Sequence, residues 1–194
     1  MILYMLDNAK RALRQRMLQE RAALSKLERE RISEGIYRNL LSDKGLANSK
    51  VIFLYCSTND EIDTDKIAEY CLLSGKTVCA PRCIGHGVMS AHEIKSLSGL
   101  VPGKYGIREP KPDSRVVSPD QIDLVLAPCL CADRRGYRLG YGGGYYDRFL
   151  EKTSATIVAL CASSRLMPLI PADGHDCRCH KIVTDTEVVV TYEK

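Results

Sequence analysis

The chain has 194 residues, of which 45% are hydrophobic and 27% are charged, and its formal net charge is +4. These values predict one domain spanning residues 1–194, long enough to bury a core. The small positive charge does not by itself indicate nucleic-acid binding, although it suits a protein that handles anions, and the six-residue apolar start is far below the roughly 20 residues that a membrane span needs.

Two helices are predicted at the N-terminus. The first covers about residues 7–24, and the second opens at a capping box formed by Ser25 and Glu28 and continues through about Leu41. The first helix carries a cluster of basic residues: Lys10, Arg11, Arg14 and Arg16. Together the two helices form an arm that precedes the first strand.

A strand–helix–strand unit follows. The apolar run at 50–57 predicts a buried strand, residues 63–75 predict a helix that ends near Gly75, and residues 76–81 predict the next strand. This spacing indicates a parallel pair with a right-handed crossover. A further strand is expected at 89–94, before a turn-rich segment.

The C-terminal half continues the alternation. A strand is predicted at 121–128, a loop at 129–144, a helix from about Gly144, and further strands near 156–161 and within 181–190. We therefore predict an α/β protein: an open, mostly parallel sheet with flanking helices, Rossmann-like and three-layered, with an N-terminal helical arm.

The stretch RLGYGGGYYDR, residues 138–148, follows the strand at 121–128. Ligands of open parallel sheets bind outside the carboxyl ends of the strands, where this loop is expected to lie. Its glycines let backbone N–H groups face an anion, and the start of the next helix adds a favourable dipole. Arg138 can pair with phosphate oxygens, and Asp147 can stabilise the helix start or bind a metal.

The glycine spacing matches neither common nucleotide motif. Gly140, Gly142 and Gly144 are two residues apart, which excludes the dinucleotide fingerprint, and the P-loop pattern is absent. A glycine-rich turn between a strand and a helix is more often structural than functional. The adjacent Arg138, the tyrosine pair and Asp147 shift the interpretation towards phosphate binding.

Two further segments predict ligand contacts near the same edge. Lys10 and Arg14, one helical turn apart, form a basic face that suits phosphates, although a solvated helix face is the alternative. Glu61 follows the first strand and suits the amidine-like edge of a heterocycle. Its alternative is helix capping, for which Asp63 and Thr64 are better placed.

The segment at 173–181 concentrates polar side chains: Asp173, His175, Asp176 and His180 are expected in one turn, either as metal ligands or as a solvated turn.

The nine cysteines are odd in number and include no Cys-x-x-Cys. Two Cys-x-Cys pairs, 129/131 and 177/179, leave zinc as an alternative, but reduced thiols in a cytoplasmic protein are favoured.

Taken together, these segments resemble the 5-formyltetrahydrofolate cyclo-ligase family nearly end to end. The resemblance is carried by KRALR, NDEIDT, APRC, YGIREP, DRRGYRLGYGGGYYDRFL and HDCRCHKIVTD. It implies an ATP- and Mg²⁺-dependent cyclisation of 5-formyltetrahydrofolate to 5,10-methenyltetrahydrofolate, with ADP and phosphate released. It also implies a cytoplasmic enzyme, expected to be a monomer, with no nucleic-acid or membrane partner.

The resemblance assigns roles by position. It places ATP against two runs: Lys10, Arg11, Ala12, Leu13 and Arg14, and Arg138, Leu139, Gly140, Tyr141, Gly142, Gly143, Gly144, Tyr145 and Tyr146. It places the folate against Cys56, Glu61, Tyr141, Gly142, Gly143, Gly144 and Tyr145. It makes Asp147 and Asp176 the magnesium ligands, and Arg138 and Lys10 the catalytic cations.

The chain departs from the family pattern in two places. Cys129 and Ala132 stand where many members have a glycine and an aromatic residue, which puts the shape of the folate pocket in doubt. His180 and Lys181 stand where an acid is common, which makes the assignment of Asp176 less secure than that of Asp147.

Three other functions remain open on the residues alone. One is a sugar-phosphate isomerase or coenzyme A transferase on a similar scaffold, which would need a catalytic base or glutamate. Another is a nucleotide- or folate-binding module without catalysis, which the presence of Arg138, Asp147 and the basic cluster disfavours. The third, nucleic-acid binding, lacks the expected basic aromatic stripe.

Overall fold

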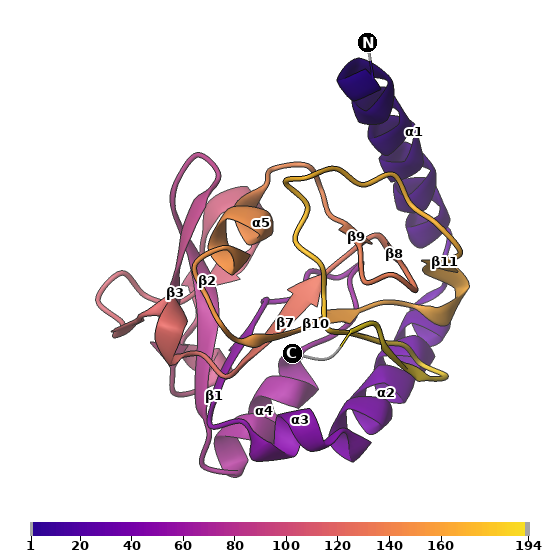
Figure 1. Cartoon of the computed structure of the whole chain (residues 1–194). Helices are drawn as coiled ribbons and strands as arrows, with labels where there is room; N and C mark the ends of the chain where they lie inside the picture. The colour runs from indigo at the N-terminus through magenta and orange to yellow at the C-terminus, as the bar shows by residue number, and fades with distance from the viewer. Residues whose placement is uncertain (1, 193–194) are drawn as a thin grey trace.

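The computed structural model describes residues 2–192, and an eight-stranded sheet organises them (Figure 1). The strand order is β13-β12-β10-β7-β1-β2-β3-β6. Five contiguous strands are parallel: β12 (Lys181–Val183), β10 (Thr156–Leu160), β7 (Leu124–Pro128), β1 (Val51–Leu54) and β2 (Thr77–Gly85). The edges are antiparallel: β13 (Val188–Val190), β3 (Val88–Ile94) and β6 (Val116–Val117). The predicted mostly parallel α/β sheet is confirmed.

Alternating side chains divide the core between the two faces of the sheet. In β1, Ile52 and Leu54 pack on one face and Phe53 packs on the other, as the period of two requires. The first face is covered by α2 (Lys26–Ser42), α3 (Lys44–Asn48) and α4 (Asp65–Leu73), and the second by α5 (Tyr145–Leu150). The result is the predicted three-layer arrangement.

The predicted strand–helix–strand unit with parallel strands is confirmed. β1 pairs in parallel with β2, with Val51 opposite Thr77, and α4 connects them. The strand expected at 89–94 is β3. The segment after it consists of short pieces: η1 (Leu97–Gly99), β4 (Val101–Pro102), η2 (Lys104–Gly106), β5 (Arg108–Glu109) and η3 (Pro119–Gln121).

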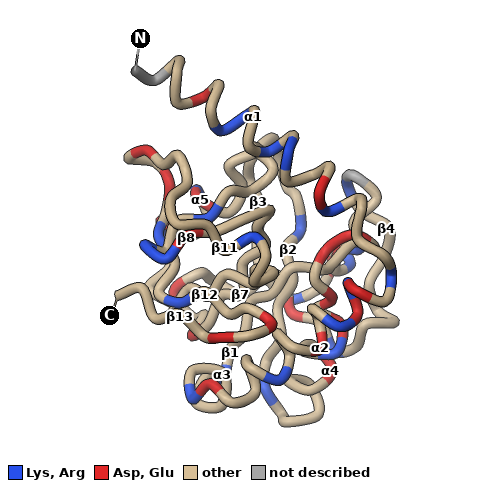
Figure 2. The backbone as a smooth tube through the Cα atoms, turned by 90° about the vertical axis from the view of Figure 1, so that its right-hand side faces the viewer, with Lys and Arg blue, Asp and Glu red and all other residues tan. Residues whose placement is uncertain are grey.

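The N-terminal arm differs from its predicted bounds. The helix α1 covers Ile2–Ala22 because the apolar start contains no helix breaker, and it ends where the Ser25 capping box opens α2. Its first turns project beyond the rest of the chain (Figures 1 and 2). Lower down, Leu13 and Met17 pack on a small cluster that includes Leu130 and Ile170.

The C-terminal half of α1 packs on a second sheet, which has three strands. It consists of β8 (Cys131–Asp133), β9 (Arg138–Leu139) and β11 (Leu166–Met167), which follows η4 (Ser163–Arg165). β9 leads directly into the glycine-rich loop. The packing of α1 on this small sheet therefore brings the basic helix to that loop. Among the described residues, no helix combines the length and hydropathy needed to cross a membrane.

The packing of the core predicts that truncating a central side chain lowers the free energy of unfolding strongly. Phe53 is 0% exposed and stacks on Phe149 with ring centroids 4.6 Å apart. Phe53→Ala is expected to lower the free energy of unfolding by about 3–5 kcal/mol in urea denaturation, because it leaves a cavity. Leu73→Ala, on a side chain that is 89% exposed, is the control. A loss below about 1 kcal/mol for Phe53→Ala would contradict this packing.

Candidate active site

The glycine-rich loop lies between β9 and α5, at the edge where β1, β7 and β10 end. Gly142 and Gly144 have φ values of +94° and +64°, conformations that side chains rarely adopt. The helix after the loop has only six residues, so its dipole is smaller than the sequence pattern suggested. Binding at this loop therefore depends mainly on local N–H groups and side chains.

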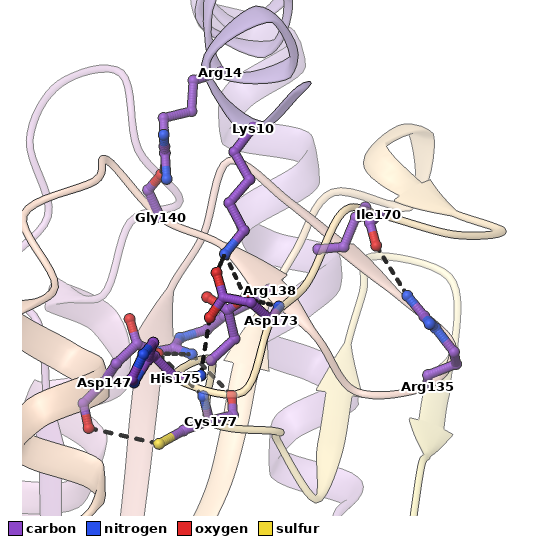
Figure 3. A network of polar contacts seen from close by, with 11 residues as sticks. Lys10, Arg14, Arg135, Arg138, Gly140, Asp147, Ile170, Asp173, His175 and Cys177 are labelled. Carbon is purple, nitrogen blue, oxygen red and sulfur yellow. Dashed lines mark hydrogen bonds and ion pairs between the residues drawn. The ribbon is translucent and has the colours of Figure 1, made fainter. Parts of the chain in front are cut away.

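An ion pair between the buried Arg138 and the half-buried Asp147 fixes both ends of the loop. Both terminal nitrogens of Arg138 lie 3.1 Å from Asp147 Oδ1, and Arg138 is 6% exposed. Arg138 also donates to the Cys177 carbonyl at 3.1 Å, and the Cys177 N–H donates to the same Asp147 oxygen at 3.3 Å. The two ends of the loop thus meet the distant backbone of Cys177 at this pair (Figure 3).

Arg148 holds the loop from its other side, and the sequence analysis did not single it out. It donates to the Gly87 carbonyl at 2.7 Å and to the Gly143 carbonyl. A Cβ at Gly144 would lie 2.8 Å from the guanidinium of Arg148. The signal in the sequence was its position one helical turn after Gly144. Tyr145 adds a contact to the Gly85 carbonyl at 3.4 Å.

The basic face of α1 meets partners instead of forming a solvated helix face. Lys10 is 6% exposed, and its ammonium lies 2.6 Å from Asp173 (Figure 3). It also lies 2.5 Å from Asp176. Burial lowers the pKa of Lys10, but the two carboxylates outweigh it and leave that pKa raised. Arg14 donates to the Gly140 carbonyl at 3.0 Å. Arg11 and Ala12 are exposed, and Leu13 packs inward.

The polar turn near the C-terminus contains Asp173, His175 and Asp176, but the prediction that His180 belongs to it was wrong. His180 is buried and accepts a hydrogen bond from the Ile157 N–H at 2.9 Å. The chain enters β12 at this point, so backbone pairing turns His180 away. Hydrogen bonding to Lys10 lowers the pKa of Asp173.

Glu61 contacts the glycine-rich loop through Tyr141, away from the Lys10 cluster, and it does not cap α4. Its Oε2 accepts from the Thr58 N–H at 2.9 Å, and its Oε1 accepts from the Tyr141 hydroxyl at 2.6 Å. Asp63, as the alternative suggested, accepts from the first N–H of α4 at 2.9 Å. The turn after β1 therefore presents Glu61 to the tyrosine of the glycine-rich loop.

Two predicted site residues lie deeper. Cys56 is buried, which raises the pKa of its thiol to about 12, so at neutral pH it is a neutral packing group. The Tyr146 hydroxyl is buried and has no hydrogen-bond partner among the described residues. An unsatisfied buried hydroxyl is costly, which makes it available to a ligand.

The two carboxylates predicted to bind Mg²⁺ flank Cys177. Burial raises the pKa of that thiol, and Asp147 and Asp176 both raise it further. Each carboxylate uses one oxygen in the pairs described above. No group of three or more potential metal-ligating side chains exists within residues 2–192. Mg²⁺ commonly takes one or two carboxylates and substrate phosphates, so this donor set fits it. All nine cysteines are free.

The fold is that of an α/β protein with a mostly parallel sheet, and the candidate site lies at the carboxyl edge of that sheet. The chain belongs to the 5-formyltetrahydrofolate cyclo-ligase family, since that family's model matches residues 6–185, and it is therefore a ligase. The family resemblance inferred from its motifs is thus confirmed.

Individual relatives cover nearly the whole chain. It is 31% identical to the 5-formyltetrahydrofolate cyclo-ligase of Mus musculus, over 91% of this chain and 94% of that protein. It is 28% identical to a probable 5-formyltetrahydrofolate cyclo-ligase of Caenorhabditis elegans, over 95% and 97%. The structure of Aquifex aeolicus 5,10-methenyltetrahydrofolate synthetase superposes with a TM-score of 0.86 at 32% identity, covering 95% and 94% of the two chains.

The contacts of Arg148 predict that it orders the loop. Arg148→Gln is expected to increase amide hydrogen exchange at residues 140–144 by about tenfold or more, because two carbonyl contacts are lost. Arg134→Gln, which removes an exposed arginine paired with Glu187, is the matched control. Unchanged exchange in the glycine-rich loop of Arg148→Gln would show that the backbone alone holds it.

Proposed function

We propose that this protein catalyses the ATP- and Mg²⁺-dependent conversion of 5-formyltetrahydrofolate to 5,10-methenyltetrahydrofolate, with release of ADP and phosphate. The observation that carries the proposal is the position of the glycine-rich loop. One of its tyrosines contacts the carboxylate of Glu61, while its two ends reach the cations and carboxylates around Lys10 and Arg138. We also propose that it acts as a monomer in the cytoplasm.

The folate is assigned to the side of Glu61. A carboxylate there suits the amidine edge of the pterin ring, which offers two N–H donors. A groove of ≈ 720 Å³ continues from Glu61 along α2 and gives room for the remainder of the substrate. Cys56 lies in the buried wall behind this region and contributes packing, because its neutral thiol is a poor nucleophile.

The triphosphate is assigned to the side of α1. Lys10 and Arg14 reach this side of the loop, and Gly140 to Gly144 offer backbone N–H groups to phosphate oxygens. Arg138 is buried against Asp147, so it adds positive charge close to the phosphates while holding the loop in place. Asp147 and Asp176 would hold Mg²⁺, which supplies charge neutralisation at the phosphate oxygens.

The proposed reaction has two steps. The formyl oxygen attacks the γ-phosphorus, the bond to ADP breaks, and the formyl carbon becomes an iminium phosphate. The N10 nitrogen then attacks that carbon, loses its proton, and the carbon–oxygen bond breaks to release inorganic phosphate. Neither step needs a protein nucleophile, so catalysis consists of positioning and electrostatic stabilisation.

The proposal is tested by following the absorbance of methenyltetrahydrofolate when the protein is mixed with 5-formyltetrahydrofolate, ATP and Mg²⁺. We expect the absorbance to grow only when ATP is present. A folded, reduced sample that binds ATP but forms no product would contradict the proposal and favour a binding module without catalysis.

A second prediction concerns Asp147. Asp147→Asn keeps a hydrogen-bond acceptor for Arg138 but removes the charge, so the Mg²⁺ concentration for half-maximal turnover is expected to rise about tenfold or more. Glu151→Gln, one turn further along, is the control. Titration of turnover with MgCl₂ measures both. An unchanged Mg²⁺ requirement in folded Asp147→Asn would remove Asp147 from the metal site.

A further inference from the structure

A small pocket lies between the end of α1, the start of α2 and the loops after β1, β7 and β10, and its lining includes both hydrogen-bond partners of the Tyr141 hydroxyl. Glu61 and Tyr55 line it from the first of these loops, Cys129 lines it from the second, and Arg165 from the third. Arg21, in the last turn of α1, and Arg29 complete it. The pocket thus combines one side of the predicted folate site with three arginines that lie outside the glycine-rich loop and the Lys10 cluster.

Arg165 is the unusual member of this set. It is 7% exposed, and no hydrogen bond or salt bridge joins its side chain to any residue among 2–192. Burial lowers the pKa of its guanidinium, and the nearby charge of Arg21 lowers it further. Its side chain lines the pocket, so its N–H donors can be reached by a ligand that enters there. A guanidinium in this setting therefore favours a ligand that brings a hydrogen-bond acceptor.

The Tyr141 hydroxyl shows which groups such a ligand must carry. It accepts a hydrogen bond from the Arg21 guanidinium and donates one to Glu61 Oε1 at 2.6 Å. The guanidinium carbon of Arg21 also lies 5.2 Å from the centre of the Tyr141 ring. A ligand that displaces this hydroxyl must offer Glu61 a donor and the arginines an acceptor. A cyclic –NH–C(=O)– group presents the two side by side.

We propose that Arg165, with Arg21, binds the ring carbonyl of the folate while Glu61 binds the adjacent ring N–H. This inference rests on the proposed function, because it names how the same substrate is selected. The alternative acceptor, a phosphate of ATP, is disfavoured here because an ionised phosphate has no N–H to replace the donor that Tyr141 gives to Glu61. Arg165 and Arg21 are thus substrate-binding residues that set specificity for the 4-oxo ring.

The test compares two ligands on two proteins by calorimetry. The ligands are 5-formyltetrahydrofolate and its 4-amino-4-deoxy analogue, which replaces the carbonyl oxygen with a donor. Arg165→Gln is expected to weaken binding of the 4-oxo ligand by about 10- to 100-fold, the loss typical of a hydrogen bond to a charged group. Binding of the analogue is expected to change by less than about threefold. Arg115→Gln, an exposed arginine paired with Glu93, is the control.

Equal weakening of both ligands by Arg165→Gln, or a raised KM for ATP with an unchanged KM for the folate, would overturn the inference. If Arg165→Gln does not fold, ¹⁵N spectra of arginine side chains in the wild-type protein decide. The Arg165 Nε signal, identified with Arg165→Lys, must shift on adding 5-formyltetrahydrofolate and stay in place with ATP. A shift with ATP alone would assign the pocket to phosphate.

The experiment on Arg165 can fail or succeed independently of the test of the proposed reaction. Ligand discrimination by a protein that forms no methenyltetrahydrofolate would support the binding role of Arg165 and refute the proposed catalysis. Product formation by a protein without this discrimination would refute only the role of Arg165.

Discussion

The site depends on the ion pair between the buried Arg138 and the half-buried Asp147. It connects β9, α5 and the backbone of Cys177, and so closes the glycine-rich loop at both ends. A buried pair loses much of its Coulomb energy to desolvation, so its value here lies in geometry more than in stability. Loss of Asp147 would leave the buried charge of Arg138 without its carboxylate, and loss of either partner would release the loop from the backbone of Cys177.

The other charges of the site are also paired in the unliganded chain. Lys10 neutralises Asp173 and Asp176, and Arg14 contacts the loop backbone. In the proposed function these groups exchange partners: phosphate oxygens replace carboxylates around Lys10, and Asp176 becomes available to Mg²⁺. Because α1 packs on the body at one end and projects at the other, the element that carries Lys10 is suited to adjust when ligands bind.

Patterns of apolar residues predicted the fold because they follow local rules. The alternation of Ile52, Phe53 and Leu54 and the spacing to β2 determine a parallel unit. The glycine-rich loop could be placed at the correct edge for the same reason. The partners of side chains could not: Lys10 reaches Asp173 and Asp176 across 163 and 166 residues, and only the packing of α1 brings them together. His180 was misplaced because β12 begins beside it, and Arg165 carried no motif at all.

The most direct test of the account is the fate of the formyl oxygen. 5-Formyltetrahydrofolate labelled with ¹⁸O in its formyl group is incubated with the protein, ATP and Mg²⁺, and the inorganic phosphate is analysed by mass spectrometry. Because the account requires that oxygen to attack the γ-phosphorus, it predicts one ¹⁸O in the phosphate formed with each methenyltetrahydrofolate. Unlabelled phosphate formed together with product would contradict it, because ATP would then be hydrolysed by water and the formyl oxygen would leave by another route.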